Sequence, residues 1–145
     1  MSKSDIVKIK SSVLKKIREH ALNIYEKFKS EVIGYLIGNF EEGVILIDDI
    51  VIPKQDSTNI HAEITDERSL TDYLKNNLNK IQVGWYHSHP DLGCFLSSVD
   101  VPTQKYWQRV NNKMIALVID PIRNEIRIFR LDENDQTYEI AFKKI

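Results

Sequence analysis

The order of helical and β-branched segments is the feature that most limits how this sequence can fold. Apolar residues recur at helical spacing in some stretches, and runs rich in Val and Ile, which are typical of strands, lie between and after them. We expect helices over about 12–29, over a stretch opening at 65–67, and over 98–111. We expect strands over 31–40, 44–53, 81–89, 114–120, 124–131 and 136–145. Such a mixed order predicts an α/β, or mixed α+β, protein with a central mixed sheet flanked by helices.

Turn and cap residues suggest where these elements begin and end. Ser11 and Ser12 are candidate N-caps of the first helix, because a hydroxyl oxygen can accept a bond from a free backbone N–H. Gly43, in Glu-Glu-Gly, suits the tight turn of a hairpin between the first two strands. Residues 65–67 are expected to open the second helix, and its narrow apolar face runs to Leu78.

Length and composition exclude several classes of protein. The 145 residues suffice for one domain, which we expect to span 1–145, and are too few for a (β/α)8 barrel of roughly 250 residues. The formal net charge of -1 gives no global field that would attract nucleic acid or an anionic membrane. No apolar run approaches the roughly 20 residues of a membrane span. Cys94 is the only cysteine, so no internal disulfide can form, and we expect a cytoplasmic protein.

Two of the four histidines fall within one tripeptide, His87-Ser88-His89. On a strand, alternate side chains leave the same face, so both imidazoles can converge on one metal ion. Asp100, near the start of the third helix, can supply a carboxylate as third ligand. Three such ligands with one open position suit catalytic zinc, although a 2-His-1-carboxylate iron site uses the same ligand types.

Each of these residues also has an ordinary structural interpretation. Ser97-x-x-Asp100 alone predicts a helix capping box, and single histidines are common as hydrogen-bond partners in cores. Cys94 as a protease nucleophile is disfavoured, because a free cysteine is usually a small buried hydrophobe. A zinc deaminase is excluded, since its H-x-E and P-C-x-x-C signature needs more than one cysteine.

The segment from Gly84 to Gln104, GWYHSHPDLGCFLSSVDVPTQ, closely resembles the JAMM motif of the MPN+ metalloprotease family. In that motif His-x-His-Pro is followed by Gly and then by Ser-x-x-Asp. Within the family, the Gly-Cys-aromatic-Leu-Ser sequence at 93–97 is most similar to that of the deubiquitinating subunit of the proteasome lid and of the deneddylating subunit of the signalosome. Upstream, Glu31 with Gly34 and Gly38 matches the family pattern Glu-x-x-Gly-x-x-x-Gly. The resemblance runs from about 13 to 131 and implies an MPN/JAMM fold similar to cytidine deaminases.

The resemblance also implies roles for individual residues. His87, His89 and Asp100 would hold one Zn2+ with a bound water, and Glu31 would act as general base. From the residues alone, Glu63 and Glu67 are rivals for that role, and only the glycine spacing favours Glu31. The resemblance assigns the Ser97 hydroxyl to stabilising the oxyanion, with helix capping as its other role. Trp85 is interpreted as a core residue.

These assignments predict a zinc-dependent isopeptidase, a deubiquitinase-like hydrolase. It would cut the bond between the C-terminal glycine of ubiquitin, or of a small archaeal ubiquitin-like modifier, and a lysine amine. Segments 59–64 and 91–96 are the expected walls of the substrate site. The lack of a long C-terminal extension favours a minimal, archaeal-type enzyme, monomeric or a small homo-oligomer, with a proteasome as a further candidate partner. The alternative is a non-catalytic MPN scaffold that binds modifiers or partner subunits.

Overall fold

The computed structural model describes residues 5–57, 62–66 and 68–145, with side chains described in 5–53 and 68–145. The described strands form an eight-stranded sheet in the order β10-β1-β3-β2-β6-β7-β8-β9 and a two-stranded sheet of β4 and β5. In the large sheet the strands are β1 (Ile6–Ile9), β2 (Ile33–Glu41), β3 (Val44–Val51), β6 (Ile81–Ser88), β7 (Ile115–Asp120), β8 (Glu125–Leu131), β9 (Thr137–Ile140) and β10 (Phe142–Lys144). The small sheet pairs β4 (Lys54–Ser57) with β5 (Ala62–Asp66). The predicted mixed α+β architecture is confirmed.

The large sheet curves until its two edges come together. β9 and β10 stand at opposite ends of the strand order, yet only Ala141 separates them in sequence. Because one intervening residue spans no more than about 7 Å of extended chain, both edges must lie close to this residue. The strand predicted over 136–145 is therefore two strands on two edges. β1, which the sequence did not predict, pairs in parallel with both β3 and β10.

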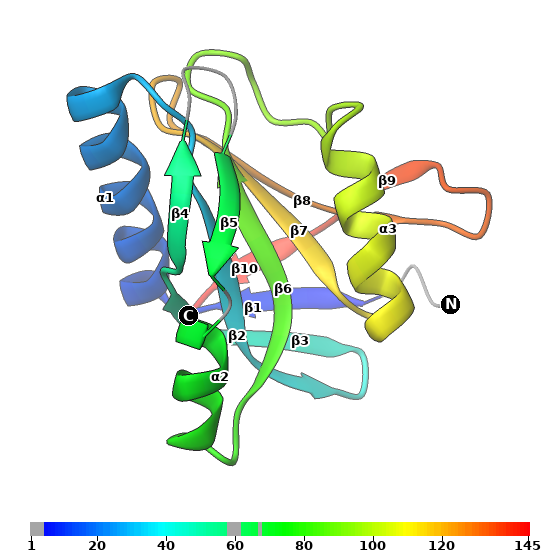
Figure 1. Ribbon diagram of the computed structural model, residues 1–145. Coiled ribbons are helices and arrows are strands. Elements are labelled where there is room, and N and C mark those ends of the chain that lie inside the picture. The colour runs from blue at the N-terminus through cyan, green and yellow to red at the C-terminus, as the bar shows by residue number, and fades with distance from the viewer. Residues whose placement is uncertain (1–4, 58–61, 67) are drawn as a thin grey trace.

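Within the described residues, three helices cover the sheet, namely α1 (Ser11–Phe28), α2 (Arg68–Lys75) and α3 (Asp100–Val110) (Figure 1). The main core lies between α1 and one face of the sheet, where Leu36, Leu117 and Ile119 are fully buried. On the other face, Tyr35 and Ile37 pack against α2 and α3. Because alternate residues of β2 enter these two clusters, the central strands are buried on both faces, which explains their continuous apolar runs. No helix in the described part of the chain is long and apolar enough to span a bilayer.

The first helix and the hairpin agree with the sequence, but the predicted caps do not. Ser11 lies in the first turn of α1, where its N–H and its hydroxyl donate to the carbonyl oxygen of Ile145 at 2.9 and 3.2 Å. The N-cap is Lys10, whose side chain makes no capping bond. Between β2 and β3 the turn contains Gly43 at φ +70°, as predicted.

The second helix is shorter than its apolar pattern suggests. It ends at Lys75, and Leu78 is 90% exposed. The side-chain amides of Asn76 and Asn77 donate to the carbonyl oxygens of Asp72 and Tyr73, at 3.0 and 2.8 Å. These bonds satisfy carbonyls that a further helical turn would otherwise use. Of the predicted opening residues 65–67, Asp66 belongs to β5 and Glu67 lies outside the described residues.

Candidate metal centre

His87 and His89 lie where β6 ends, and their imidazoles meet the Asp100 carboxylate at the start of α3. The His87 and His89 Nε2 atoms are 3.0 Å apart. The Asp100 Oδ2 atom lies 2.8 Å from His87 Nε2 and 3.1 Å from His89 Nε2. All three residues are buried. Strand alternation thus brings together the residues predicted as metal ligands.

The donor set fits a small divalent cation. Ligand atoms about 2.0–2.2 Å from a tetrahedral zinc ion stand roughly 3.3 Å from one another. The separations of 2.8 to 3.1 Å observed here are close to that value. Two imidazole nitrogens and a carboxylate oxygen, each able to donate an electron pair, also lie within reach of one ion, an arrangement that a cation stabilises.

The second ring nitrogen of His89 faces a backbone acceptor. Its Nδ1 lies 3.3 Å from the carbonyl oxygen of Gly93, which can only accept. A hydrogen on Nδ1 can donate to this oxygen, and in that tautomer the Nε2 lone pair faces Asp100 and His87, as cation binding requires. Burial lowers the pKa of His89, but the hydrogen bond and negative charge of Asp100 outweigh burial and raise it above its ordinary value.

His87 is oriented by stacking. The Trp85 ring lies parallel to the His87 ring, with centroids 4.7 Å apart and planes 13° apart. Trp85 Nε1–H in turn donates to Gln104 Oε1 on α3 at 2.8 Å. The His87 Nδ1 atom is buried and has no hydrogen-bond partner among the described residues, and burial lowers the pKa of His87. Trp85, interpreted from sequence as a core residue, is buried but also contacts the site.

Ser97 and Asp100 form the predicted capping box. Asp100 N–H donates to Ser97 Oγ at 3.2 Å, and Ser97 N–H donates to Asp100 Oδ2 at 2.9 Å. The first helical bond runs from Val101 N–H to Ser97 O, so Ser97 is the N-cap in hydrogen-bonding terms. Burial opposes ionisation of Asp100, but the bonds from His87, His89 and Ser97 outweigh it and hold its pKa well below the usual range. The cap thereby aims the carboxylate at the histidines.

Glu31 lies just before β2, opposite the end of β6. Ile33 pairs with His87 in the antiparallel ladder. Ser88 extends that pairing, because its N–H donates to Val32 O at 3.1 Å and its Oγ accepts Val32 N–H at 2.8 Å. Continuing the register places Glu31 beside His89 and on the same face. The charge of Glu31 is accordingly among the causes that raise the pKa of His89, after burial and Asp100.

The alternative general bases and the substrate-site segments predicted from sequence are only partly described in the structure. Glu67 and residues 59–61 lie outside the described residues, and the Glu63 side chain is likewise undescribed. Phe95, in the 91–96 segment, packs its ring against His89 at a centroid distance of 4.8 Å and is 46% exposed, so this segment does border the histidines.

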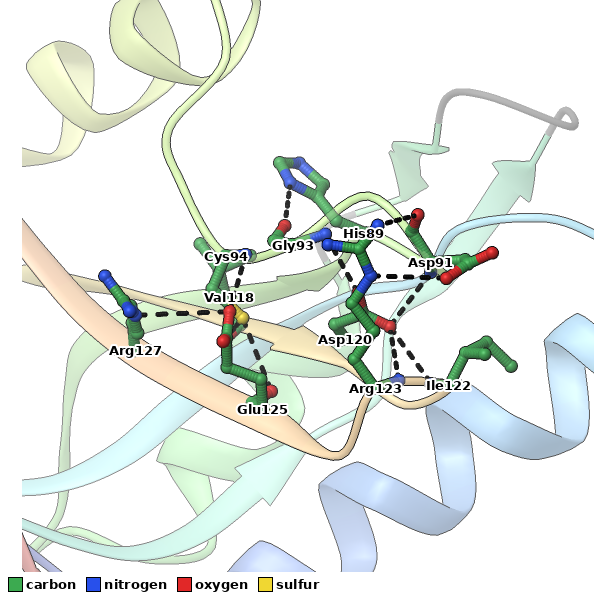
Figure 2. Close-up of polar contacts among 10 residues, drawn as sticks. All are labelled: His89, Asp91, Gly93, Cys94, Val118, Asp120, Ile122, Arg123, Glu125 and Arg127. Carbon is green, nitrogen blue, oxygen red and sulfur yellow. Dashed lines mark hydrogen bonds and ion pairs between the residues drawn. The ribbon is translucent and has the colours of Figure 1, made fainter.

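Cys94 is a structural thiol, as predicted. Its Sγ–H lies 3.3 Å from the carbonyl oxygens of both Val118 and Glu125 (Figure 2). Burial, together with the Glu125 carboxylate, raises the thiol pKa to about 12. A thiol with such a pKa supplies almost no thiolate at neutral pH and is not a nucleophile.

Comparison with known proteins identifies the family. Residues 2–113 match the family described as JAB1/Mov34/MPN/PAD-1 ubiquitin protease. The match covers more than half of the 145 residues, so the chain belongs to this family. The predicted JAMM/MPN+ resemblance is therefore confirmed.

Curated relatives are similar over part of their length. The 26S proteasome regulatory subunit RPN11 of Candida glabrata is 40% identical over 99 residues, 65% of this chain and 32% of the relative. The subunit of the same name from Encephalitozoon cuniculi is 33% identical over 141 residues, 90% of this chain and 47% of the relative. The AMSH-like protease sst2 of Schizosaccharomyces pombe is 35% identical over 119 residues, 82% of this chain and 27% of the relative. The chain thus spans less than half the length of these three relatives.

Proposed function

We propose that this protein is a zinc-dependent isopeptidase that releases ubiquitin or a ubiquitin-like modifier from lysine side chains. The observation that carries the proposal is the buried convergence of two imidazole nitrogens and one carboxylate oxygen, each within 3.1 Å of the others. Membership of the ubiquitin-protease family and the names of the relatives support this choice of reaction.

In this proposal His87, His89 and Asp100 hold the zinc ion. Zinc bound there would lower the pKa of a water molecule toward about 7 and polarise the carbonyl of the scissile amide. The second contacts of the ligands keep them in place, because Gly93 fixes the His89 ring, Trp85 stacks on His87, and the capping box holds Asp100.

Glu31 and Ser97 complete the reaction in this proposal. The Glu31 carboxylate accepts a proton from the attacking water and returns it to the lysine nitrogen as the C–N bond breaks. The Ser97 hydroxyl, whose oxygen already accepts the Asp100 N–H, is left to donate its hydrogen to the carbonyl oxygen as negative charge develops there.

The names of the relatives support ubiquitin conjugates as substrates and a proteasome as a partner. We propose that 1–145 acts as a single catalytic domain in the cytoplasm, as a monomer or small homo-oligomer. Conjugates of ubiquitin or of a small archaeal ubiquitin-like modifier are the proposed substrates. The relatives named as proteasome regulatory subunits make a proteasome the proposed larger partner.

Incubation of zinc-loaded protein with a diubiquitin panel and with conjugates of small archaeal modifiers tests this proposal. We expect Glu31→Gln and a chelator-treated sample to cut none of them. The matched control is Glu133→Gln, which makes the same chemical change at an exposed residue between β8 and β9. We expect this control to cut normally.

The outcomes separate enzyme from scaffold. Cleavage that survives Glu31→Gln or zinc removal would contradict the mechanism, and full zinc occupancy in His89→Ala would contradict the ligand assignment. A wild-type protein that binds modifier and zinc but cuts no conjugate would favour the non-catalytic scaffold.

A further inference from the structure

A fully buried carboxylate, Asp120, lies beneath the segment that follows His89. It is the last residue of β7, and its side chain has 0% exposure. Its Oδ1 accepts the backbone N–H of Asp91 at 2.9 Å and those of Ile122 and Arg123 at 3.0 Å each. Its Oδ2 accepts the Gly93 N–H at 2.9 Å (Figure 2). One side chain thus receives four backbone hydrogen bonds.

These four bonds have two different purposes. The bonds from Ile122 and Arg123 close the turn between β7 and β8, as an aspartate at the first position of a turn commonly does. The bonds from Asp91 and Gly93 come from 29 and 27 residues away in sequence. They fasten the segment after His89 to the end of β7.

The fastened segment has a backbone that needs support. Leu92 N–H donates to His89 O at 3.1 Å, which closes a β-turn with Pro90 and Asp91 at its centre. Asp91 has φ +61° and Gly93 has φ +82°. A positive φ is unfavourable for a residue with a Cβ such as Asp91, so outside contacts must hold it. Besides Asp120, Arg123 donates to the Asp91 carboxylate and carbonyl at 3.2 and 3.1 Å.

Gly93 connects this anchor to the candidate metal centre. Its N–H faces Asp120, while its carbonyl oxygen faces His89 Nδ1 at 3.3 Å. The next N–H, that of Cys94, donates to Glu125 Oε1 at 3.0 Å. The N–H groups of Gly93 and Cys94 are therefore both bound by carboxylates of the β7–β8 hairpin, Asp120 and Glu125. Of these two carboxylates, only Asp120 is fully buried.

We infer that Asp120 is a positioning residue for His89: it holds the turn at 91–93 so that the Gly93 carbonyl keeps the hydrogen of His89 on Nδ1 and leaves Nε2 free to bind a cation. The cation-binding part rests on the proposed function, whereas the tautomer part does not. Backbone bonds outweigh the effect of burial and keep the pKa of Asp120 below its ordinary value, so the side chain accepts from all four donors at neutral pH.

Asp120→Asn tests the inference with the smallest change of shape. One oxygen becomes an NH2 group, and the amide keeps most bonds when its oxygen faces the three donors on the Oδ1 side. The NH2 group then faces the Gly93 N–H, which is also a donor, so the hydrogen bond that is lost is the one from Gly93. Asp5→Asn is the matched control, because it makes the same chemical change at a carboxylate away from the turn. Asp5 pairs at 3.0 Å with the buried Arg130, which lies five residues along β8 from Glu125, the end of β8 nearest the turn.

Two measurements on both variants and on wild type decide the matter. Ring 15N shifts, taken at a pH high enough for His89 to be neutral, should show its hydrogen on Nδ1 in wild type and Asp5→Asn, and a mixture of tautomers in Asp120→Asn. Competition with a chromophoric chelator should show zinc dissociation constants raised about 10- to 100-fold in Asp120→Asn, as for other ligand-orienting contacts, and within about twofold of wild type in Asp5→Asn. An unchanged tautomer and an unchanged affinity in Asp120→Asn would overturn the inference.

Wild-type protein alone gives an independent test if Asp120→Asn does not fold. Amide hydrogen exchange at Asp91 and Gly93 should be as slow as in the β7 ladder, and fast exchange at both positions would overturn the inference. Failure of the proposed function looks different. In that case wild type binds no zinc or cuts no conjugate, while the His89 ring shifts and the exchange rates still decide the role of Asp120.

Discussion

Replacing Ser97 with alanine should damage catalysis far more than stability. The Ser97 oxygen accepts one N–H, that of Asp100, at 3.2 Å, and its hydrogen is the group proposed to stabilise the oxyanion. The reverse bond, from Ser97 N–H to Asp100 Oδ2, involves the backbone at position 97 and survives the substitution. Only half of the capping box is lost.

The two expected losses differ severalfold in free energy. Removing a serine N-cap costs about 0.5–2 kcal/mol, and we expect the lower half of that range because the reciprocal bond remains. Removing one oxyanion donor costs about 2.7–4 kcal/mol of transition-state stabilisation, which lowers kcat about 10²- to 10³-fold. A purely structural Ser97 would show the first loss without the second.

Urea unfolding and cleavage of a fluorogenic ubiquitin substrate, both well below the unfolding temperature, measure the two losses separately. Ser97→Gly is the informative control, since glycine at an N-cap costs only a few tenths of a kcal/mol but has no hydroxyl. It should be nearly as stable as wild type and as inactive as Ser97→Ala, whereas Ser97→Thr should recover activity. A kcat of Ser97→Gly within threefold of wild type would refute the catalytic role.

Three further predictions concern the surrounding fold. Burial lowers the His20 pKa from its ordinary 6.5 to about 4, so the unfolded chain binds the proton first as pH falls. Urea unfolding should then show stability declining between those pH values by at most about 3 kcal/mol, and His20→Gln should remove this slope. Gly38→Ala should cost about 2–4 kcal/mol in the same assay, because its Cβ would overlap the Leu46 carbonyl oxygen across the strand pair. Gly43→Ala, which meets open space, should cost only about 1 kcal/mol for its positive φ; equal losses would contradict the overlap argument. Trp85→Phe keeps a ring beside His87 but deprives Gln104 of its donor, so we expect a loss of about 1–3 kcal/mol by thermal unfolding, and no loss would show that the bond contributes nothing.

Local patterns predicted the elements on which the candidate site stands. The helical stripe from Val13 to Phe28 and the hairpin with Gly43 are both present, because their signals lie within a few residues of one another. Strand alternation also predicted that His87 and His89 would converge, and the capping pattern correctly placed Asp100 at a helix start.

The features that sequence reasoning missed depend on distant partners. β1 is only four residues long, Ile6–Ile9, and charged residues flank it. Its pairing with β3 and β10 leaves no signal in the local sequence. Nothing marks Ala141 as the point where the chain changes edges. Asp-Pro at 120–121 is a typical turn sequence, but the bonds that Asp120 accepts from Asp91 and Gly93 cross 27 residues or more and have no local signal.

The glycine spacing that singled out Glu31 now has a physical explanation. A Cβ on Gly34 would overlap the ring of Tyr86, and one on Gly38 would overlap the backbone of β3. Both glycines therefore permit β2 to lie close to its neighbours, and that closeness keeps Glu31 in register beside His89. The pattern is first a packing requirement, and through packing it places the carboxylate.

The position of β10 beside β1 means that this edge of the sheet can be completed only late in synthesis. β1 leaves the ribosome well before β10, and until β10 follows, one side of β1 has exposed backbone donors and acceptors. The first turn of α1 likewise lacks a partner until Ile145 is synthesised, because the Ile145 carbonyl oxygen accepts both bonds from Ser11. We therefore expect nascent chains stalled before residue 142 to be more prone to association through the edge of β1 than the released protein.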